Sequence, residues 1–593
     1  MASLSSVSLS TSSSETSIFR STNWKISVLP TGVVRTFPDI KKSRKQINYV
    51  AYVQPPDVNR PQSSIRSTSF NVEGTGHTTS VDEVVKVDTS RIEANSIKLP
   101  LPLFENQSSS TDAQTDDSAS LSIAVIGATG VLARTKIFPA LFALYCSGQL
   151  PEKFCIFGYS RKNLTEEDLR AIIAPTLSCR IDHQESCEEK MDAFLKRTFY
   201  LYGGYDNREG MSKLNTLMEE VEGKFGANRI FYLSVPQDAL IDIASSLAEK
   251  AQTQRAWNRV IIEKPFGLGS FSSHQLTTSL LSNFEEKQLY RIDHLLGRNT
   301  IENLAVLRFS NLVFMPLWNR SYIHNIQVIF SEELGMQNSA RYPYGYGILG
   351  DVVHSHIFQT VALLAMEPPV TLDGEDVRYE KVKVLKSIRK LESSDVILGH
   401  CEADSGSNFK DTDNLMPTYF GAVLHIDNAR WDGVPFLIKA GRGLKKNRVE
   451  ICIQFRRVPG NLYHKDGEHM QNLASNELIL RDVPDEAILV RINNKIPGLG
   501  MNLEASELNL LYKDKYNVDV TDSYEQLLHD VIDGDNHLFM RSDEVEAAWN
   551  ILSPVLSELD HSNVTLERYN LGSKGPDKAA NLWAKYGAKW LDD

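Results

Sequence analysis

SIAVIGATGVLARTKIFPALFALYCSG, residues 122–148, is the stretch of this chain that decides its fold class. It predicts an apolar strand, a glycine turn and an amphipathic helix, the first βα unit of a dinucleotide-binding fold. Gly127 and Gly130 permit a tight turn, and free N–H groups at the helix start can hold a pyrophosphate. A single glycine pattern is weak evidence, because ordinary turns use the same spacing. The predicted cofactor-binding residues are Gly127, Ala128, Thr129, Gly130, Val131, Leu132, Ala133 and Arg134.

The segments that follow extend this unit. Residues 154–162, FCIFGYSRK, predict a second strand that ends in Arg161 and Lys162, where folds specific for NAD tend to carry an acid. Because a guanidinium can hold a 2′-phosphate through two parallel bonds, Arg161 favours NADP; the alternative is a pair of solvated surface charges. Predicted strands at 229–236 and 259–267 alternate with helical stretches, which indicates a parallel sheet with helices on both faces.

Length, composition and charge exclude several classes of protein. The chain is 42% hydrophobic and 23% charged, a composition typical of globular proteins. Its 593 residues are too many for one small module. With 63 Lys and Arg against 75 Asp and Glu, the net charge of -12 offers no global basic field for nucleic acid or an anionic membrane. The best candidate for a membrane span, 352–366, contains His354, His356 and Gln359, so no transmembrane segment is expected. No CxxC pair is present, and we predict no metal site.

The first fifty residues differ from the rest. They hold twelve Ser and seven Lys or Arg but only two acids, which is typical of an organelle transit peptide, and the Met-Ala-Ser start favours a plastid. The alternative is a disordered tail without a targeting function. Residues 51–118 are polar and weakly patterned, so we expect a flexible arm or linker there, with globular structure from 119.

Four later motifs resemble one enzyme family. IIEKPFG at 261–267, RIDHLLGRNTIENL at 291–304, DVVHSHIFQ at 351–359 and VPFLIKAGRGL at 434–444 are similar to glucose-6-phosphate dehydrogenase of the plant plastid type. The similarity runs from about 121 to beyond 585. Motifs of this length in this order are specific for homology, although a relative can keep the scaffold and lose the chemistry.

The resemblance implies an architecture. An α/β, Rossmann-like NADP-binding domain at 119–291 should precede a larger α+β domain at 292–593, which binds substrate and dimerises through a mainly antiparallel sheet. The local patterns agree with this expectation. Strand-like alternation occurs at 420–429, 449–458, 476–483 and 487–494, and helical patterns occur at 521–534 and 543–559.

The resemblance also implies a reaction, the transfer of hydride from C1 of glucose 6-phosphate to NADP to give 6-phosphogluconolactone, the first step of the oxidative pentose phosphate pathway. His356 matches the family's base, which takes the proton of the C1 hydroxyl. Asp351 matches a carboxylate that orients this imidazole. On the sequence alone, His354 and His356 are more often core histidines; the resemblance assigns the base to His356 and leaves His354 as structural.

The resemblance implies substrate contacts at matching positions, and His294 and Arg298 match the segment that holds the substrate phosphate in the family. Lys264, towards the carboxyl end of the predicted strand at 259–267, matches a lysine that touches both substrate and cofactor, and Lys136 aligns with a cation near the substrate. The substrate-binding residues expected from the family are Lys264, His294, Leu295, Arg298, Glu332, Asp351, Arg442 and Asn447.

Departures from the family pattern leave two hypotheses open. The family's D-H-Y-L-G-K-E is D-H-L-L-G-R-N here, and Leu295 cannot donate a phenol hydrogen bond to phosphate, a loss of about 1.5–3 kcal/mol. Val131, Gly350 and Asn447 also replace charged residues of the family, and Arg298 replaces a lysine. The chain is therefore either an NADP-dependent dehydrogenase with weakened substrate affinity or a weak or inactive subunit that hetero-oligomerises with an active relative and regulates it.

Three further expectations rest on the resemblance. Cys179 and Cys187 stand where plastid members carry a disulfide that thioredoxin reduces, although a pair eight residues apart could be coincidence. A homodimer or tetramer in the chloroplast stroma is expected. Some members hold a second, structural NADP, and the basic residues at or near those positions are Lys439, Arg448, Arg481, Arg491 and Lys574.

Overall fold

The computed structural model describes residues 24–28, 34–38, 120–178, 184–205, 207–332, 346–402, 416–464, 474–516, 522–561 and 565–587. The chain divides into two units, 1–108 and 109–593. In the first unit, β1 (Trp24–Val28) pairs with β2 (Val34–Pro38) in an antiparallel ladder. Apart from these two strands, the predicted transit peptide and the linker to residue 118 lie outside the described residues.

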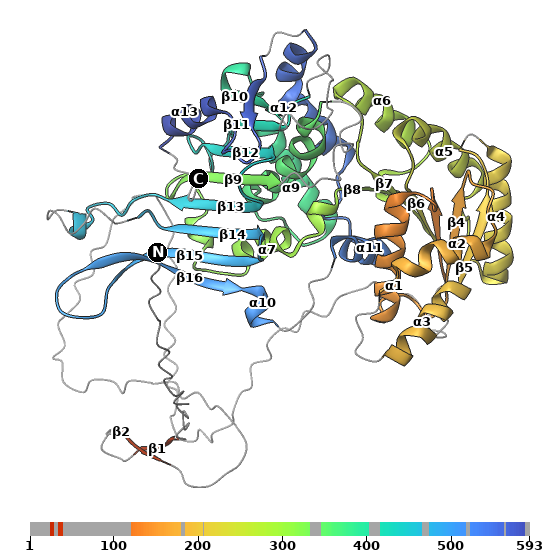
Figure 1. The fold of residues 1–593 in the computed structure, drawn as a ribbon, viewed down its shortest axis with the longest axis horizontal. Helices are drawn as coiled ribbons and strands as arrows, with labels where there is room; N and C mark the ends of the chain where they lie inside the picture. Colours follow the sequence, from red (N-terminus) through yellow and green to blue (C-terminus); the bar gives the residue numbers. More distant parts are fainter. Residues whose placement is uncertain are drawn as a thin grey trace, which may run out of the picture. The chain divides into compact units, whose positions relative to one another are not determined.

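The second unit begins with a six-stranded parallel sheet in the order β5-β4-β3-β6-β7-β8 (Figure 1). Every residue of β3 is buried, since a parallel sheet covered on both faces needs strands that are apolar throughout. This sheet confirms the predicted Rossmann-like fold. Its strands are β3 (Leu121–Ile126), β4 (Phe154–Ser160), β5 (Thr198–Tyr202), β6 (Asn228–Leu233), β7 (Asn258–Glu263) and β8 (Leu289–Ile292).

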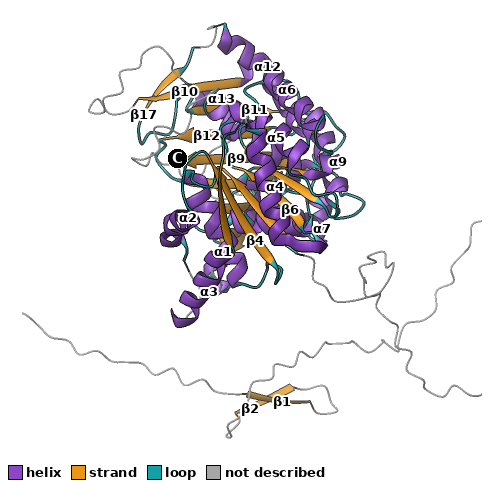
Figure 2. Ribbon diagram, turned by 90° about the vertical axis from the view of Figure 1, so that its right-hand side faces the viewer, coloured by secondary structure: helices purple, strands orange, loops and turns teal. Residues whose placement is uncertain are grey.

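Helices connect these strands, and several lie beside the sheet in Figure 2. One π-helical turn, η1 (Ala133–Ile137), leads into α1, which packs on α3, while α5 packs between α4 and α6. At the start of α2, Thr165 and Asp168 form a capping box that satisfies two otherwise free N–H groups. The helices are α1 (Phe138–Cys146), α2 (Glu166–Ile173), α3 (Gln184–Lys196), α4 (Arg208–Glu222), α5 (Gln237–Lys250) and α6 (Ser270–Leu281).

A nine-stranded sheet in the order β16-β15-β14-β13-β9-β12-β11-β10-β17 forms the second part, drawn from green to blue in Figure 1. Only the β9–β12 and β10–β17 pairs are parallel, which confirms the expected mainly antiparallel sheet. The strands are β9 (Ile323–Glu332), β10 (Val396–Glu402), β11 (Tyr419–Leu424), β12 (Phe436–Arg442), β13 (Arg448–Phe455), β14 (Glu477–Val483), β15 (Ala487–Lys495), β16 (Leu503–Leu511) and β17 (Glu567–Asn570).

The helices of this part include two segments that carry site residues, the short helix η5 (His294–Gly297) and the π-helical η7 (Leu349–Ile357), which continues into α8. None of the described helices is both long enough and apolar enough to cross a membrane. The others are α7 (Asn299–Phe309), α8 (Phe358–Ala365), α9 (Gly374–Ser387), α10 (Tyr512–Lys515), α11 (Ser523–Asp533), α12 (Ser542–Asp560) and α13 (Asp577–Lys585).

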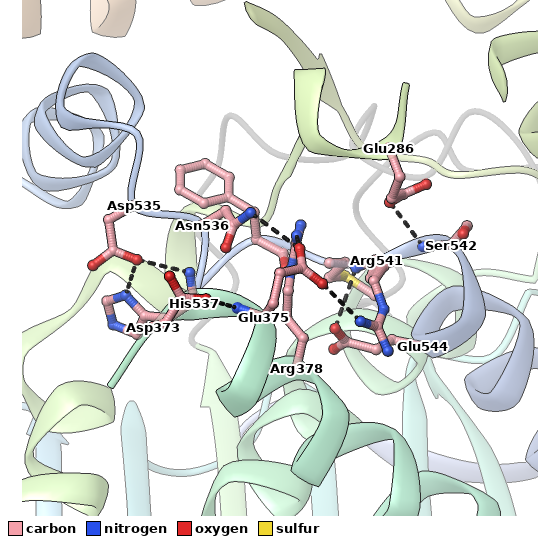
Figure 3. A network of polar contacts seen from close by, with 12 residues as sticks. Glu286, Asp373, Glu375, Arg378, Asp535, Asn536, His537, Arg541, Ser542 and Glu544 are labelled. Atoms are coloured by element: carbon pink, nitrogen blue, oxygen red, sulfur yellow. Dashed lines mark hydrogen bonds and ion pairs between the residues drawn. The ribbon is translucent and has the colours of Figure 1, made fainter. Parts of the chain in front are cut away.

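Buried polar contacts at β8 join the domain of the six-stranded sheet to the domain of the nine-stranded sheet. Arg291 of β8, 2% exposed, donates to Glu286 at 2.5 Å and to the carbonyl of Met540 at 3.2 Å. Glu286 also accepts from the backbone N–H of Ser542, the first residue of α12, at 3.1 Å (Figure 3). These contacts fix the end of β8, which leads directly into η5.

A second group of contacts, centred on Glu375 of α9, holds the segment before α12 (Figure 3). The Glu375 carboxylate accepts from Arg378 at 2.7 Å, from Arg541 at 2.8 Å and from Asn536 at 3.3 Å. Burial alone would raise the pKa of Glu375, but the positive charges of Arg378 and Arg541 outweigh burial, so the pKa lies below its usual value. The charged network therefore ties α9 to the start of α12.

Candidate active site

The candidate site lies at the carboxyl ends of β7 and β8, where open α/β sheets bind their ligands. Lys264 directly follows β7, and Asp293 and His294 directly follow β8. Asp351 and His356 come from η7, which the chain reaches only after α7 and β9. The fold thus brings together three segments that are distant in the sequence.

Lys264 is held by two carboxylates. Its Nζ donates to the backbone carbonyl of Asp351 at 3.0 Å and lies 3.2 Å from Asp293 Oδ1 and 3.7 Å from Asp351 Oδ1. Burial lowers the pKa of this ammonium, but Asp293 and Asp351 outweigh burial, so the pKa is raised. Lys264 is therefore a fixed cation at neutral pH rather than a base.

Asp293 is a site residue that the sequence analysis did not single out. It is 0% exposed, and its Oδ1 accepts from the N–H of Leu295 at 3.2 Å. Burial raises the pKa of this carboxyl, but Lys264 and His356 outweigh burial, so the pKa is lowered and the group is ionised. Its Oδ2 has no hydrogen-bond partner among the described residues. The signal in the sequence is its position between β8 and His294.

His356 is a buried, neutral imidazole. It is 6% exposed, and its ring meets Phe330 edge-on with centroids 5.5 Å apart. Burial lowers its pKa to about 4, with Asp293 opposing and Lys264 adding to the effect. Its Nδ1 is buried and has no hydrogen-bond partner in the described part of the chain. The ring is thus uncharged at pH 7 and has capacity to take up a proton.

His354, two residues earlier, has a different setting. Its ring stacks on Trp549 with centroids 3.9 Å apart, and its Nε2 lies 3.2 Å from the carbonyl of Val545. Burial also lowers its pKa to about 4. These contacts agree with the structural role expected for His354.

Asp351, predicted to orient His356, lies with its side chain 36% exposed beside Lys264. No hydrogen bond between described residues joins it to His356, and Asp293 is the carboxylate whose charge raises the pKa of that ring. The orienting role of Asp351 stays a prediction, with Asp293 as a second candidate for it.

A hollow lined mainly by apolar side chains adjoins His356, and it includes Leu295, Arg298, Phe330 and Asp482. Arg298, at the N-cap of α7, places its Nη1 2.7 Å from Asp482 Oδ2 of β14. The Asp482 side chain is 5% exposed and that of Arg298 is 36% exposed. Leu295 is buried in the same lining. The predicted phosphate-gripping arginine therefore already faces a carboxylate of the same chain.

The remaining predicted substrate residues lie on nearby elements. His294 stacks on Tyr524 of α11 with centroids 5.6 Å apart. Arg442 and Glu332 are register partners on β12 and β9, and Arg442 Nε lies 3.2 Å from Glu332 Oε2. Glu332 lies on β9 two residues after Phe330, whose ring contacts His356. Asn447 is exposed in the turn between β12 and β13.

The glycine turn between β3 and η1 packs closely against the chain after β6. Gly127 has φ +94°, and a Cβ there would lie 2.0 Å from the carbonyl oxygen of Ser234. Val131 at the helix start is 68% exposed. Arg161 is exposed after β4, with its guanidinium 4.5 Å from the centroid of the Tyr205 ring. The residues present therefore fit a dinucleotide at this edge.

The other residues predicted around the glycine turn differ in burial and in hydrogen bonding. Ala128 and Ala133 are fully buried, Leu132 is half-buried, and Arg134 Nε donates to the carbonyl of Gly130 at 3.3 Å. Thr129 donates to the hydroxyl of Ser160 at 3.2 Å. Lys136, predicted near the substrate, forms a 2.8 Å ion pair with Asp522, the N-cap of α11.

Three of the five residues predicted for a second dinucleotide site line one hollow, and the site itself stays a prediction. Lys439, Arg448 and Lys574 line one hollow together with Lys445 and Lys446. The other two predicted residues, Arg481 and Arg491, are outside that lining. Arg481 donates to the carbonyl of Asp485 at 3.1 Å, and Arg491 pairs with Glu477 at 3.2 Å and Glu507 at 3.0 Å.

The cysteines fall into two groups. Cys187 is disulfide-bonded, while its predicted partner, Cys179, lies outside the described residues. Cys401 and Cys452 are buried free thiols, and Cys146 and Cys155 are half-buried free thiols packed against the core. No described group of His, Cys, Asp and Glu could hold a metal ion.

Comparisons with known proteins agree with this geometry. Residues 124–303 match the model of the glucose-6-phosphate dehydrogenase NAD binding domain, and residues 305–591 match the C-terminal domain. The Arabidopsis thaliana protein named inactive glucose-6-phosphate 1-dehydrogenase 4, chloroplastic, is 66% identical over 476 residues, which is 80% of this chain and 76% of that protein. The chloroplastic glucose-6-phosphate 1-dehydrogenase of Solanum tuberosum is 50% identical over 482 residues, 80% of this chain and 84% of that one.

Among solved structures, that of glucose-6-phosphate dehydrogenase in complex with its substrate glucose 6-phosphate aligns with a TM-score of 0.74. It is 35% identical, and the alignment covers 81% of this chain and 100% of that chain. Together with the two matched domains, which span residues 124–591 almost without a gap, this similarity assigns the fold to one family. The chain belongs to the glucose-6-phosphate dehydrogenase family.

Proposed function

We propose that this chain oxidises glucose 6-phosphate to 6-phosphogluconolactone and reduces NADP, with a weakened hold on the sugar phosphate. The observation that carries this proposal is the buried, neutral His356, placed with Asp293 and Lys264 at the carboxyl ends of β7 and β8. A base in that state can take the proton that the C1 hydroxyl loses as hydride leaves the same carbon.

Each side chain has a distinct part in this step. The neutral ring of His356 can accept the proton of the C1 hydroxyl on one of its nitrogens, and its Nδ1 is not engaged by another described residue. The Asp293 charge then stabilises the imidazolium that forms. Lys264 supplies a fixed positive charge at the junction of sugar and cofactor. NADP, when bound at the glycine turn, supplies the acceptor for the hydride.

The preference for NADP rests on the end of β4. Arg161 is exposed there, and its stacking on Tyr205 holds the guanidinium in place. A planar, oriented guanidinium suits the bidentate recognition of a 2′-phosphate. Substitution of Arg161 by Ala should therefore weaken NADP more than NAD.

We further propose that the chain acts in the plastid stroma as a homodimer or tetramer, with thioredoxin reducing a Cys179–Cys187 disulfide. The Ser-rich first fifty residues and the chloroplastic relatives support the location. The disulfide-bonded state of Cys187 supports the redox step.

The second candidate, a weak or inactive subunit that regulates an active relative by hetero-oligomerisation, is favoured by one specific observation. The guanidinium of Arg298 already faces Asp482, and Leu295 beside it offers no hydrogen bond to phosphate.

One experiment separates the two candidates. Purified protein is assayed for NADPH formation with millimolar glucose 6-phosphate and NADP, alone and mixed with an active chloroplastic relative. Turnover by the protein alone supports the dehydrogenase. Absence of turnover alone, with a changed rate or changed oligomer size of the mixture, supports the regulatory subunit and overturns the first proposal.

A further inference from the structure

We propose that Asp482 is a specificity-determining residue, an internal carboxylate that competes with a substrate phosphate for Arg298 and so disfavours phosphorylated sugars. This inference rests on the proposed function, because it concerns the phosphate end of the same site.

The geometry of the pair is that of a formed ion pair. Asp482 is the next-to-last residue of β14, and its Oδ2 lies 2.7 Å from Nη1 of Arg298 at the N-cap of α7. Helix α7 packs on β14, so both backbones are fixed by secondary structure. Both side chains line the hollow that adjoins His356. The carboxylate therefore stands within the site rather than on the outer surface.

Burial makes this carboxylate hard to displace. The Asp482 side chain is 5% exposed, so water screens its attraction to the guanidinium only weakly. Its Oδ1 and the Nε of Arg298 are buried atoms without a hydrogen-bond partner among the described residues. A phosphate that captured Arg298 would leave Asp482 as a buried charge without its cation, which is strongly unfavourable.

A second acid lies next to the pair. Glu486 accepts from Asn299, the residue after Arg298, at 3.2 Å, which places a second carboxylate beside the same helix start. Burial raises the pKa of Asp482, and Arg298 partly opposes this effect. Burial also raises the pKa of Glu486, and the charge of Asp482 adds to this increase. Leu295 contributes an apolar side chain. A phosphate dianion would thus meet two acids and one arginine.

The effect of Asp482 on phosphate affinity can be estimated from the Asp482–Arg298 hydrogen bond, which a bound phosphate would have to replace. A hydrogen bond to a charged group is worth about 1.5–3 kcal/mol, which corresponds to roughly 10- to 100-fold in affinity. Substitution of Asp482 by Asn keeps an oxygen acceptor for Arg298 but removes the competing charge. We expect the Asp482→Asn variant to bind phosphate about 10- to 100-fold more tightly than the unsubstituted chain.

The test measures binding rather than turnover. Phosphorus NMR titrations with inorganic phosphate and with glucose 6-phosphate are run on the full chain and on the Asp482→Asn and Asp482→Val variants. The matched control is Asp485→Asn, three residues further on, where the carboxylate forms a 2.9 Å ion pair with Lys513 and is 42% exposed. Adding Arg298→Gln to Asp482→Asn should abolish the gain. Thermal unfolding verifies the fold of each variant.

Tighter binding of inorganic phosphate by Asp482→Asn and Asp482→Val, but not by Asp485→Asn, supports the inference. Unchanged phosphate affinity in both Asp482 variants, a gain that survives Arg298→Gln, or loss of the fold in Asp482→Asn would overturn it. Failure of the proposed function is seen separately, as absence of NADPH formation from glucose 6-phosphate in every variant, because the phosphate titration decides the role of Asp482 without turnover.

Discussion

Exchange of two site carboxylates for amides, Asp293→Asn and Asp351→Asn, should have unequal consequences. Asp293 is 0% exposed and lies 3.2 Å from Lys264 Nζ, so its loss leaves a buried ammonium without its nearer carboxylate. Removal of one partner of a buried ion pair costs about 3–5 kcal/mol of unfolding free energy. The Asp351 side chain is 36% exposed and 3.7 Å from Lys264 Nζ, so its amide variant should lose about 0–1 kcal/mol.

The same order is expected for the chemistry. Asp293 is the carboxylate whose charge acts on His356, and its loss should lower kcat by about 10²- to 10⁴-fold, the usual contribution of positioned acid–base catalysis. Asp351→Asn should lower kcat less. Urea unfolding and the initial rate of NADPH formation measure the two effects. A larger loss of both stability and kcat in Asp351→Asn than in Asp293→Asn would refute this reasoning.

Acidification provides a further check on Asp293. Burial raises its pKa, but Lys264 and His356 outweigh burial, so the folded-state pKa lies below the unfolded value of about 3.9. Such a group contributes stability that is present above the unfolded pKa and is lost as the pH falls through the folded pKa. The gap in unfolding free energy between the unsubstituted chain and Asp293→Asn should therefore narrow below about pH 4. A gap that widens on acidification would contradict the sign.

Three other predictions test separate parts of the molecule. Burial should hold the pKa of His356 at about 4. The proton NMR shift of its Cε1–H, which is identified by its absence in His356→Gln, should therefore keep the value of a neutral imidazole from pH 8 to about pH 5. A titration midpoint near pH 6.5 would contradict this prediction. Cys179→Ser should abolish any response of activity or oligomer size to a reduced dithiol, and an unchanged response would exclude the switch. Arg291→Met should lower the unfolding free energy by about 3–5 kcal/mol, because Glu286 at the domain junction loses a buried partner. The exposed control Lys287→Met should lower it by about 0–1 kcal/mol in the same urea titration. Equal losses in the two variants would contradict a stabilising role of the buried Arg291–Glu286 pair.

The fold class was predictable because it depends on local patterns, whereas the reaction was inferred from the family resemblance. The glycine turn at Gly127, the apolar strand before it and the alternation of strands and helices are written in consecutive residues, and the structure confirms the resulting sheet. The separate settings of His354 and His356 needed the family resemblance, since both are buried and only two residues apart.

The site's electrostatics could not be predicted in the same way. Asp293 matters because β7, β8 and η7 converge on it, and no spacing in the sequence encodes that meeting. Asp482 meets Arg298 from a strand 184 residues away, so the pairing appears only when α7 packs on β14. Lys136 was predicted beside the substrate, yet its ion pair with Asp522 depends on the packing of α11 against the first helix.

The most direct test of the central claim is the rate of NADPH formation from millimolar glucose 6-phosphate by the full chain and by His356→Gln. We expect measurable turnover by the full chain, a rate lower by about 10²- to 10⁴-fold in the variant, and equal NADP binding by both. An undiminished rate in His356→Gln, or no NADPH from the unsubstituted chain, would contradict the claim.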